Sequence, residues 1–189
     1  MTRRLNSVGQ AALPVVGDLD QWLRNELRSD HAGEAGAVSI YRGILAVSRN
    51  DDVRRFAREH LATEEEHLAF FDRWLQGRDR SLLLPLWRLA GWLLGVVAAA
   101  AGARGVFLTV DAVETFVVAH YQQQIDALHD TGQWPEVRCV LETFQQDEDH
   151  HRVDALSRVD DRAPGALESA WCWLVESGSR LAVMAARVI

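Results

Sequence analysis

Two short motifs in the sequence have the spacing of metal ligands. Glu64 and His67 are three residues apart, and so are Glu148 and His151. Because residues i and i+3 lie on the same face of a helix, each pair can direct a carboxylate and an imidazole at one point. Carboxylate and imidazole ligands together suit iron or manganese better than metals that prefer thiolates.

A single glutamate precedes each motif by a similar interval. Glu34 stands thirty residues before Glu64, and Glu114 stands thirty-four residues before Glu148. A glutamate on one helix and Glu-x-x-His on the next, given twice, is the ligand set of a ferritin-like dinuclear carboxylate centre. The candidate metal ligands are therefore Glu34, Glu64, His67, Glu114, Glu148 and His151.

The only two tyrosines of the chain follow the same repeat. Tyr41 comes seven residues after Glu34, and Tyr121 comes seven residues after Glu114. Seven residues are about two helical turns, which keeps each tyrosine on the face of its helix that carries the glutamate.

The second motif overlaps an alternative with the same spacing, Asp147-x-x-His150. Glu148 and His151 continue an apolar stripe that includes Phe144, so we expect this pair to face the core. Asp147 is then better placed to orient a ligand histidine by hydrogen bonding.

A solvated acidic helix with incidental histidines would explain one Glu-x-x-His motif. Two copies, each with an upstream glutamate on an apolar helical face, favour a metal site instead. Four buried carboxylates would repel one another unless cations neutralise them, and two divalent ions would balance their charge.

The elements that must position these residues are predicted to be helices. Apolar residues at 3–4 spacing predict long helices over residues 19–47 and from residue 51 to about 75, and two further segments repeat the pattern. Gly132 and Pro135 predict the end of one helix and the start of the next. No segment shows the alternation of a strand, so we expect an all-α fold with four core helices.

Composition indicates one globular domain. The 189 residues are 48% hydrophobic and 25% charged, and we predict a tail over 1–18 followed by a single domain over 19–189. A net charge of −7 gives no indication of a nucleic-acid partner. Only Cys139 and Cys172 are present, which argues against a disulfide framework. The N-terminus has no apolar segment of the kind found in secretory signals.

An apolar insertion separates the two halves at about residues 82–104. The stretch from Leu89 to Ala103 is uncharged and has fifteen residues, fewer than the roughly twenty that a membrane-spanning helix needs. A core helix or a dimer contact would explain it. We expect instead a helix lying in one membrane leaflet, with peripheral contact from Leu82 to Ala103 and with Trp87 and Trp92 at the headgroups. A second apolar stretch ends the chain, at residues 171–189.

The sequence resembles the demethoxyubiquinone hydroxylase family of late ubiquinone biosynthesis. The local matches are Asp30-His-Ala-Gly-Glu34, the apolar insertion from Pro85 to Gly95, and the segment from Val113 through His120-Tyr121 to Ile125. With both Glu-x-x-His motifs, the similarity covers nearly everything from Arg24 to the C-terminus.

The resemblance implies that the six candidate ligands hold two iron ions, one Glu-x-x-His motif to each, with bridging carboxylates. It places His120 and Tyr121 close to the site. Where the family often has a charged run before the last motif, this chain has Gln145-Gln146.

The function implied is that of a di-iron monooxygenase that uses O2 to hydroxylate the ring of 2-polyprenyl-3-methyl-6-methoxy-1,4-benzoquinol. Its reductant would be NADH or the quinol itself, and no Gly-x-Gly-x-x-Gly fingerprint is present. A homodimer or a lipid-presenting accessory protein is expected as a further partner. The expected location is the cytoplasmic face of a bacterial cell membrane.

Two other functions fit parts of the pattern. An iron-binding ferroxidase would use the same bundle but would not need the apolar insertion. A metal-free membrane adaptor would use the insertion but would not need the six candidate ligands.

Overall fold

The computed structural model describes residues 13–189, and every regular element in that range is helical. This confirms the prediction of an all-α protein. Two short 3-10 turns accompany six longer helices. The elements in chain order are η1 (Val16–Asp18), α2 (Gln21–Val47), α3 (Asp51–Trp74), η2 (Gly77–Asp79), α4 (Leu84–Ala100), α5 (Ala103–Thr131), α6 (Pro135–Ser157) and α7 (Ala166–Val188).

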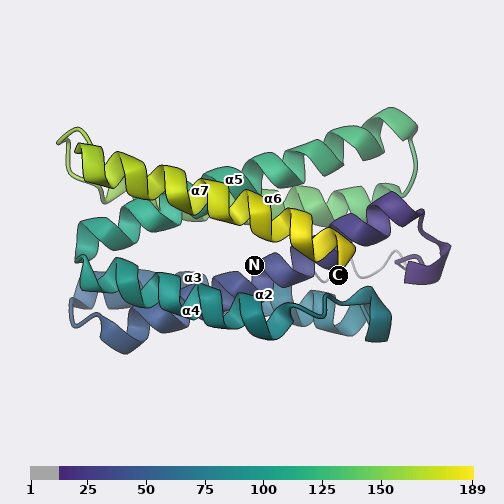
Figure 1. Ribbon diagram of the computed structural model, residues 1–189. Helices are drawn as coiled ribbons and strands as arrows, with labels where there is room; N and C mark the ends of the chain where they lie inside the picture. Colours follow the sequence, from purple (N-terminus) through teal and green to yellow (C-terminus); the bar gives the residue numbers. More distant parts are fainter. Residues whose placement is uncertain (1–12) are drawn as a thin grey trace.

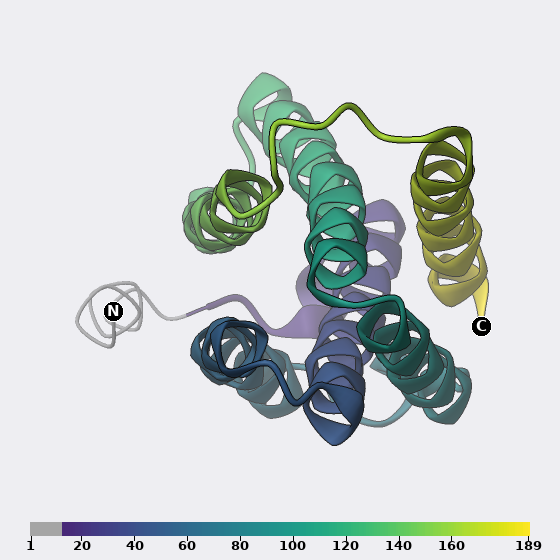
Figure 2. The same cartoon turned by 90° about the vertical axis from the view of Figure 1, so that its left-hand side faces the viewer.

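The six long helices form two layers of three (Figures 1 and 2). In one layer α2 packs between α3 and α4, and in the other α5 packs between α6 and α7. The ferritin-like four-helix bundle consists of α2, α3, α5 and α6. The apolar insertion forms α4, which occupies in its layer the place that α7 occupies in the other (Figure 2).

The helix boundaries follow local sequence signals. The Asp20 side chain accepts a hydrogen bond from the Leu23 amide and so caps α2. Asn50 caps α3 in the same way, and the left-handed Gly132 (φ 65°) ends α5. Pro135 lies in the first turn of α6, as predicted.

The α4 helix packs closely on α2 because glycines face the contact. A Cβ added at Gly43 would lie 2.2 Å from the carbonyl oxygen of Trp92, and one at Gly95 would lie 2.0 Å from that of Ile40. Larger side chains at either position would therefore push the two helices apart. Within residues 13–189, no helix has both the length and the apolar character needed to cross a membrane.

Apolar side chains form two separate core clusters. One includes Ile44 and Phe56, and the other includes Leu27 and Phe71. Val16, inside the predicted tail, is buried in the second cluster. The rest of that predicted tail, residues 1–12, lies outside the described range.

Candidate metal centre

The six residues with ligand spacing come together between four helices. Glu34 comes from α2 and Glu114 from α5, while α3 and α6 each supply one Glu-x-x-His pair. All six are 4% exposed or less. The competing histidine, His150, is exposed, so the predicted core-facing pair on α6 is confirmed.

The six residues form two overlapping groups of four that could each hold a metal ion. Within a group, one ligand atom from each residue lies within 4.8 Å of the others. Glu64 and Glu148 belong to both groups. The groups are Glu34, Glu64, His67 and Glu148, and Glu64, Glu114, Glu148 and His151.

Imidazole nitrogens and carboxylate oxygens of the cluster point toward one another, as ligands do around a cation. His67 Nδ1 lies 3.0 Å from Glu148 Oε1, and His151 Nδ1 lies 3.0 Å from Glu64 Oε1. Despite these distances, all four atoms are buried and none makes a hydrogen bond of acceptable geometry with a described residue. Buried polar atoms without partners are uncommon in proteins. Converging carboxylate oxygens and imidazole nitrogens therefore fit a pair of divalent ions.

Burial and mutual repulsion dominate the electrostatics of the carboxylates. Burial, aided by the charge of Glu148, raises the pKa of Glu64 to about 8. The same two causes raise the pKa of Glu114 well above its usual value. Burial acts in the same direction on Glu148, but close contacts with His151 and His67 outweigh it and lower its pKa. Without cations, negative charge on these buried carboxylates is costly, so some of them must remain protonated.

Each tyrosine contacts the lone glutamate of the opposite half. Tyr121 donates a hydrogen bond of 2.6 Å to Glu34 Oε1, and Tyr41 donates a longer one of 3.4 Å to Glu114 Oε1. Both tyrosines are fully buried, and burial raises the pKa of each phenol well above its usual value. They therefore act as neutral donors that orient the two carboxylates.

Asp147 lies beside a histidine of the cluster. Its Oδ2 is 3.2 Å from His67 Nε2, the nitrogen that points away from the glutamates. The ring of Phe144 stacks on His67 at 3.9 Å. A carboxylate in this position fixes the tautomer and orientation of a ligand histidine.

His120 is close to the cluster but has other partners. Its Nε2 lies 3.0 Å from Asp30 Oδ1, and Gln124 donates to the same Asp30 oxygen. His120 was expected close to the site, and Asp30 belongs to one of the matching motifs, but the sequence did not predict that these two residues and Gln124 contact one another. Asp30 lies one helical turn before Glu34, so its position on the ligand-bearing face was the available signal.

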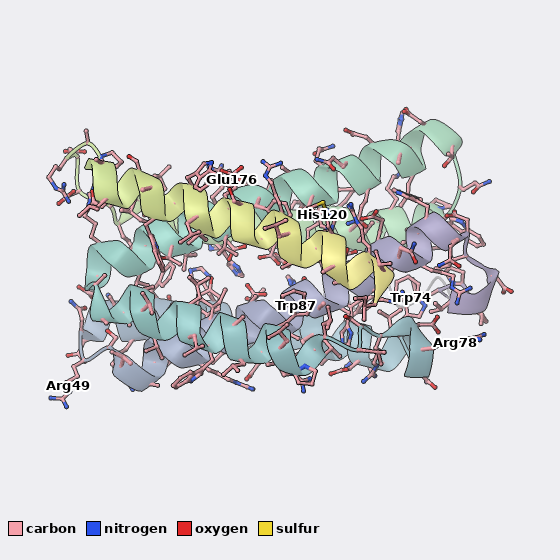
Figure 3. The ribbon with its side chains drawn as sticks, viewed as in Figure 1. Arg49, Trp74, Arg78, Trp87, His120 and Glu176 are labelled. Carbon is pink, nitrogen blue, oxygen red and sulfur yellow. The ribbon has the colours of Figure 1, made fainter. Side chains whose placement is uncertain are left out.

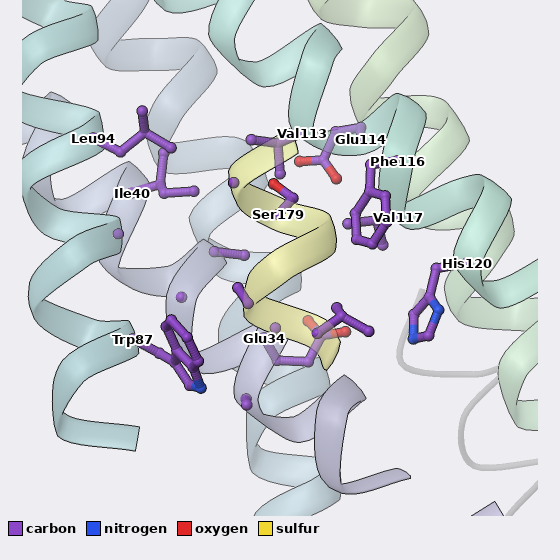
Figure 4. A pocket seen from close by; sticks show the side chains of 18 of the residues that line it. Glu34, Ile40, Trp87, Leu94, Val113, Glu114, Phe116, Val117, His120 and Ser179 are labelled. Carbon is purple, nitrogen blue, oxygen red and sulfur yellow. The ribbon is translucent and has the colours of Figure 1, made fainter. Parts of the chain in front are cut away.

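A cavity of about 390 Å³, lined mainly by residues of α2, α4, α5 and α7, reaches the carboxylates. Four glutamates of the cluster line it, and most of its other walls are apolar. Figure 4 shows two of these glutamates, Glu34 and Glu114, among the lining side chains. Trp87 on α4 and His120 on α5 lie in different layers (Figure 3), and both line the cavity. Trp87 and Trp92 were both expected at lipid headgroups; Trp87 lines the cavity, and Trp92 is exposed.

Comparisons with known proteins identify the family of this chain. The family model described as ubiquinone biosynthesis protein COQ7 matches residues 21–186. A 3-demethoxyubiquinol 3-hydroxylase of Rhodospirillum rubrum is 36% identical over 83% of this chain and 74% of its own length. The mitochondrial NADPH-dependent 3-demethoxyubiquinone 3-hydroxylase of Dictyostelium discoideum is 34% identical over 86% of this chain and 76% of its own. The human protein of that name is 31% identical over 83% and 73%. The chain belongs to the COQ7 family of ubiquinone biosynthesis proteins.

Proposed function

We propose that the chain is a 3-demethoxyubiquinol 3-hydroxylase, a monooxygenase that uses O2 to add one hydroxyl group to the ring of a demethoxyubiquinol. The observation that carries this proposal is an apolar cavity that ends at a buried carboxylate and histidine cluster. The names of relatives in Rhodospirillum rubrum and in mitochondria support the same reaction.

Two iron ions would be held by the six clustered residues. Glu34 and His67 would hold one ion, Glu114 and His151 would hold the other, and Glu64 and Glu148, which belong to both groups, would help to hold both. Four carboxylates and two neutral imidazoles balance the charge of two divalent ions. When bound, the iron pair supplies the activation of O2.

The protein's own residues would bind the ring and keep water away from it. The apolar cavity walls accept the ring and the start of the isoprenoid tail, while the carboxylates limit how deeply the ring enters. Tyr121 and Tyr41 hold Glu34 and Glu114 by hydrogen bonds. Asp147 keeps His67 in one orientation, so the cluster is organised before the substrate binds.

Exposed apolar side chains on α4 and α7 support peripheral contact with a membrane. Such contact would let a long isoprenoid tail remain in lipid while the ring reaches the cavity. We place the protein on the cytoplasmic face of a bacterial cell membrane. A second copy or a lipid-presenting protein would bind the same faces. The exposed residues on the two helices include Leu86, Leu89, Trp92, Leu93, Val97, Trp173, Leu174, Leu181 and Met184.

The reductant is a reduced nicotinamide or the quinol itself. The mitochondrial relatives carry NADPH in their names, whereas the sequence resemblance suggested NADH. Hydroxylation assays with each donor, at equal concentration, would decide between them.

Expression in a ubiquinone-making host that lacks this step and accumulates the precursor tests the function. Quinone mass spectrometry should show conversion of the precursor with the parent chain but not with Glu148→Ala. A matched control is Glu142→Ala, which removes a half-exposed carboxylate from the same helix. This variant should convert the precursor as the parent does.

The outcome also separates the alternatives. Unchanged precursor with a well-expressed, iron-containing parent chain would contradict the hydroxylase and favour the ferroxidase. Equal iron content in the parent and Glu114→Ala would contradict the metal centre and favour the metal-free adaptor.

A further inference from the structure

The two halves of the metal centre match at its core but differ in the residues around it. Tyr121 on α5 bonds to Glu34 on α2, and Tyr41 on α2 bonds to Glu114 on α5. Each half therefore supports the metal position of the other. Asp147 on α6 likewise contacts a ligand of the other half, His67 on α3.

The counterpart of Asp147 is not an acid. Asp147 directly precedes the glutamate of its Glu-x-x-His motif, and in the first half that position is Thr63. Among the described residues, no carboxylate bonds to His151 through the nitrogen that points away from the glutamates. The repeat therefore places an acid behind one ligand histidine only.

A different residue lies against His151. The ring of His60 meets it edge-on at 4.2 Å, and His60 in turn bonds to Asp154 Oδ2 at 2.9 Å. This ring contact packs against His151, but it does not fix the tautomer of His151 and does not supply a negative charge next to its ring. The hydrogen bonds to the lone glutamates also favour the position of Glu34 and His67. The bond to Glu34 is 2.6 Å long, whereas the bond to Glu114 is 3.4 Å long.

We propose that the metal position of Glu34 and His67 fills first and binds its ion more tightly than the position of Glu114 and His151, with Asp147 as the positioning residue. The inference rests on the metal centre of the proposed function. A carboxylate behind a ligand histidine raises its basicity and fixes its orientation, and loss of such a partner typically costs about 10- to 100-fold in metal affinity. At low metal, the chain should therefore hold a single ion.

Titration of the metal-free full chain with Mn²⁺, followed by electron paramagnetic resonance, tests this order. We expect an isolated bound Mn²⁺ spectrum up to one equivalent, and the spectrum of a magnetically coupled pair only as the second equivalent binds. Calorimetry of the same titration should give two steps whose affinities differ by about 10-fold or more.

Three variants identify the cause of the difference. Asp147→Ala should weaken the first step about 10- to 100-fold, and Asp147→Asn, which keeps an acceptor oxygen, should weaken it less. Thr63→Asp should strengthen the second step and leave the first unchanged. Asp154→Ala is the matched control, because it removes an acid that contacts His60 rather than a ligand histidine. It should leave the first step unchanged.

The inference is overturned by a coupled spectrum from the first addition, or by an unchanged first step in Asp147→Ala. Thr63→Asp acts on the other half, so it tests the proposal even where Asp147→Ala fails to fold. Two equal steps would overturn only this inference, whereas a chain that binds no Mn²⁺ would overturn the metal centre itself.

Discussion

Tyr121 donates a hydrogen bond of 2.6 Å to Glu34, a residue from the other half of the sequence repeat. Both residues are buried, and Tyr41 makes the reciprocal contact with Glu114. The repeated halves therefore interlock at the metal centre. Each lone glutamate is oriented by a donor from the opposite layer, which ties the geometry of the site to the packing of the two layers.

Tyr121→Phe should destabilise the metal-free protein by about 1–3 kcal/mol, because it leaves a buried carboxylate oxygen without its donor. Tyr41→Phe is the matched variant and should cost less, since its hydrogen bond is 3.4 Å long. Urea unfolding of both variants and the parent measures the difference. Equal losses in the free energy of unfolding would show that the two hydrogen bonds do not differ in strength as their lengths indicate.

Removal of metal should lower the stability of the protein. The cluster then contains four buried carboxylates without cations, and ions that bind only the folded state stabilise it by about 4 kcal/mol at 1,000 times their dissociation constant. Scanning calorimetry with and without Fe²⁺ or Mn²⁺ measures this as a higher Tm for the loaded protein. An unchanged Tm would contradict a metal site at this place.

The metal-free protein should become less stable as the pH rises from about 5 to 8. Burial raises the pKa of Glu64 from 4.5 to about 8, so between these values the folded state binds more protons than the unfolded state. The contribution of Glu64 to stability is fully present below its unfolded pKa of 4.5 and is lost as the pH rises through its folded pKa of about 8. The raised pKa values of His67 and His151 act in the same direction. Unfolding at several pH values should show the decline, and Glu64→Gln should reduce it; a parent chain whose stability does not change would refute this prediction.

Filling the cavity should impair hydroxylation without removing metal. Gly178 lies on the cavity wall, and a Cβ built there meets no other atom within 4 Å. Gly178→Leu should therefore fold, and displacement of the ring should lower kcat/KM by about 10-fold or more, since a misplacement of about 1 Å can cost about 100-fold. Gly178→Ala is the control and should remain active. Full activity in the leucine variant would place the substrate elsewhere.

The sequence repeat predicted the ligand-bearing helices and which of their faces meet. Glu64 with His67 and Glu148 with His151 share helix faces at i, i+3 spacing, and local signals such as Asn50 and Gly132 set helix ends. These features depend only on residues close in sequence.

Other features depend on how distant segments pack, and the sequence did not predict them. The pattern placed Tyr121 on the ligand face, but its partner Glu34 comes from another helix. The cavity wall at Trp87 depends on the close approach of α4 to α2, which glycines such as Gly95 allow. The position of Asp30 against His120 likewise depends on the contact between two helices.

The most direct test of the proposed activity is isotope incorporation by the purified, iron-loaded chain. The protein would be given a demethoxyubiquinol, a reductant and ¹⁸O2, and the quinone product would be analysed by mass spectrometry. We expect a hydroxylated ring that carries one ¹⁸O atom with the parent chain and none with Glu148→Ala. Oxygen consumption by the iron-loaded parent without any labelled hydroxyl group on the ring would contradict it.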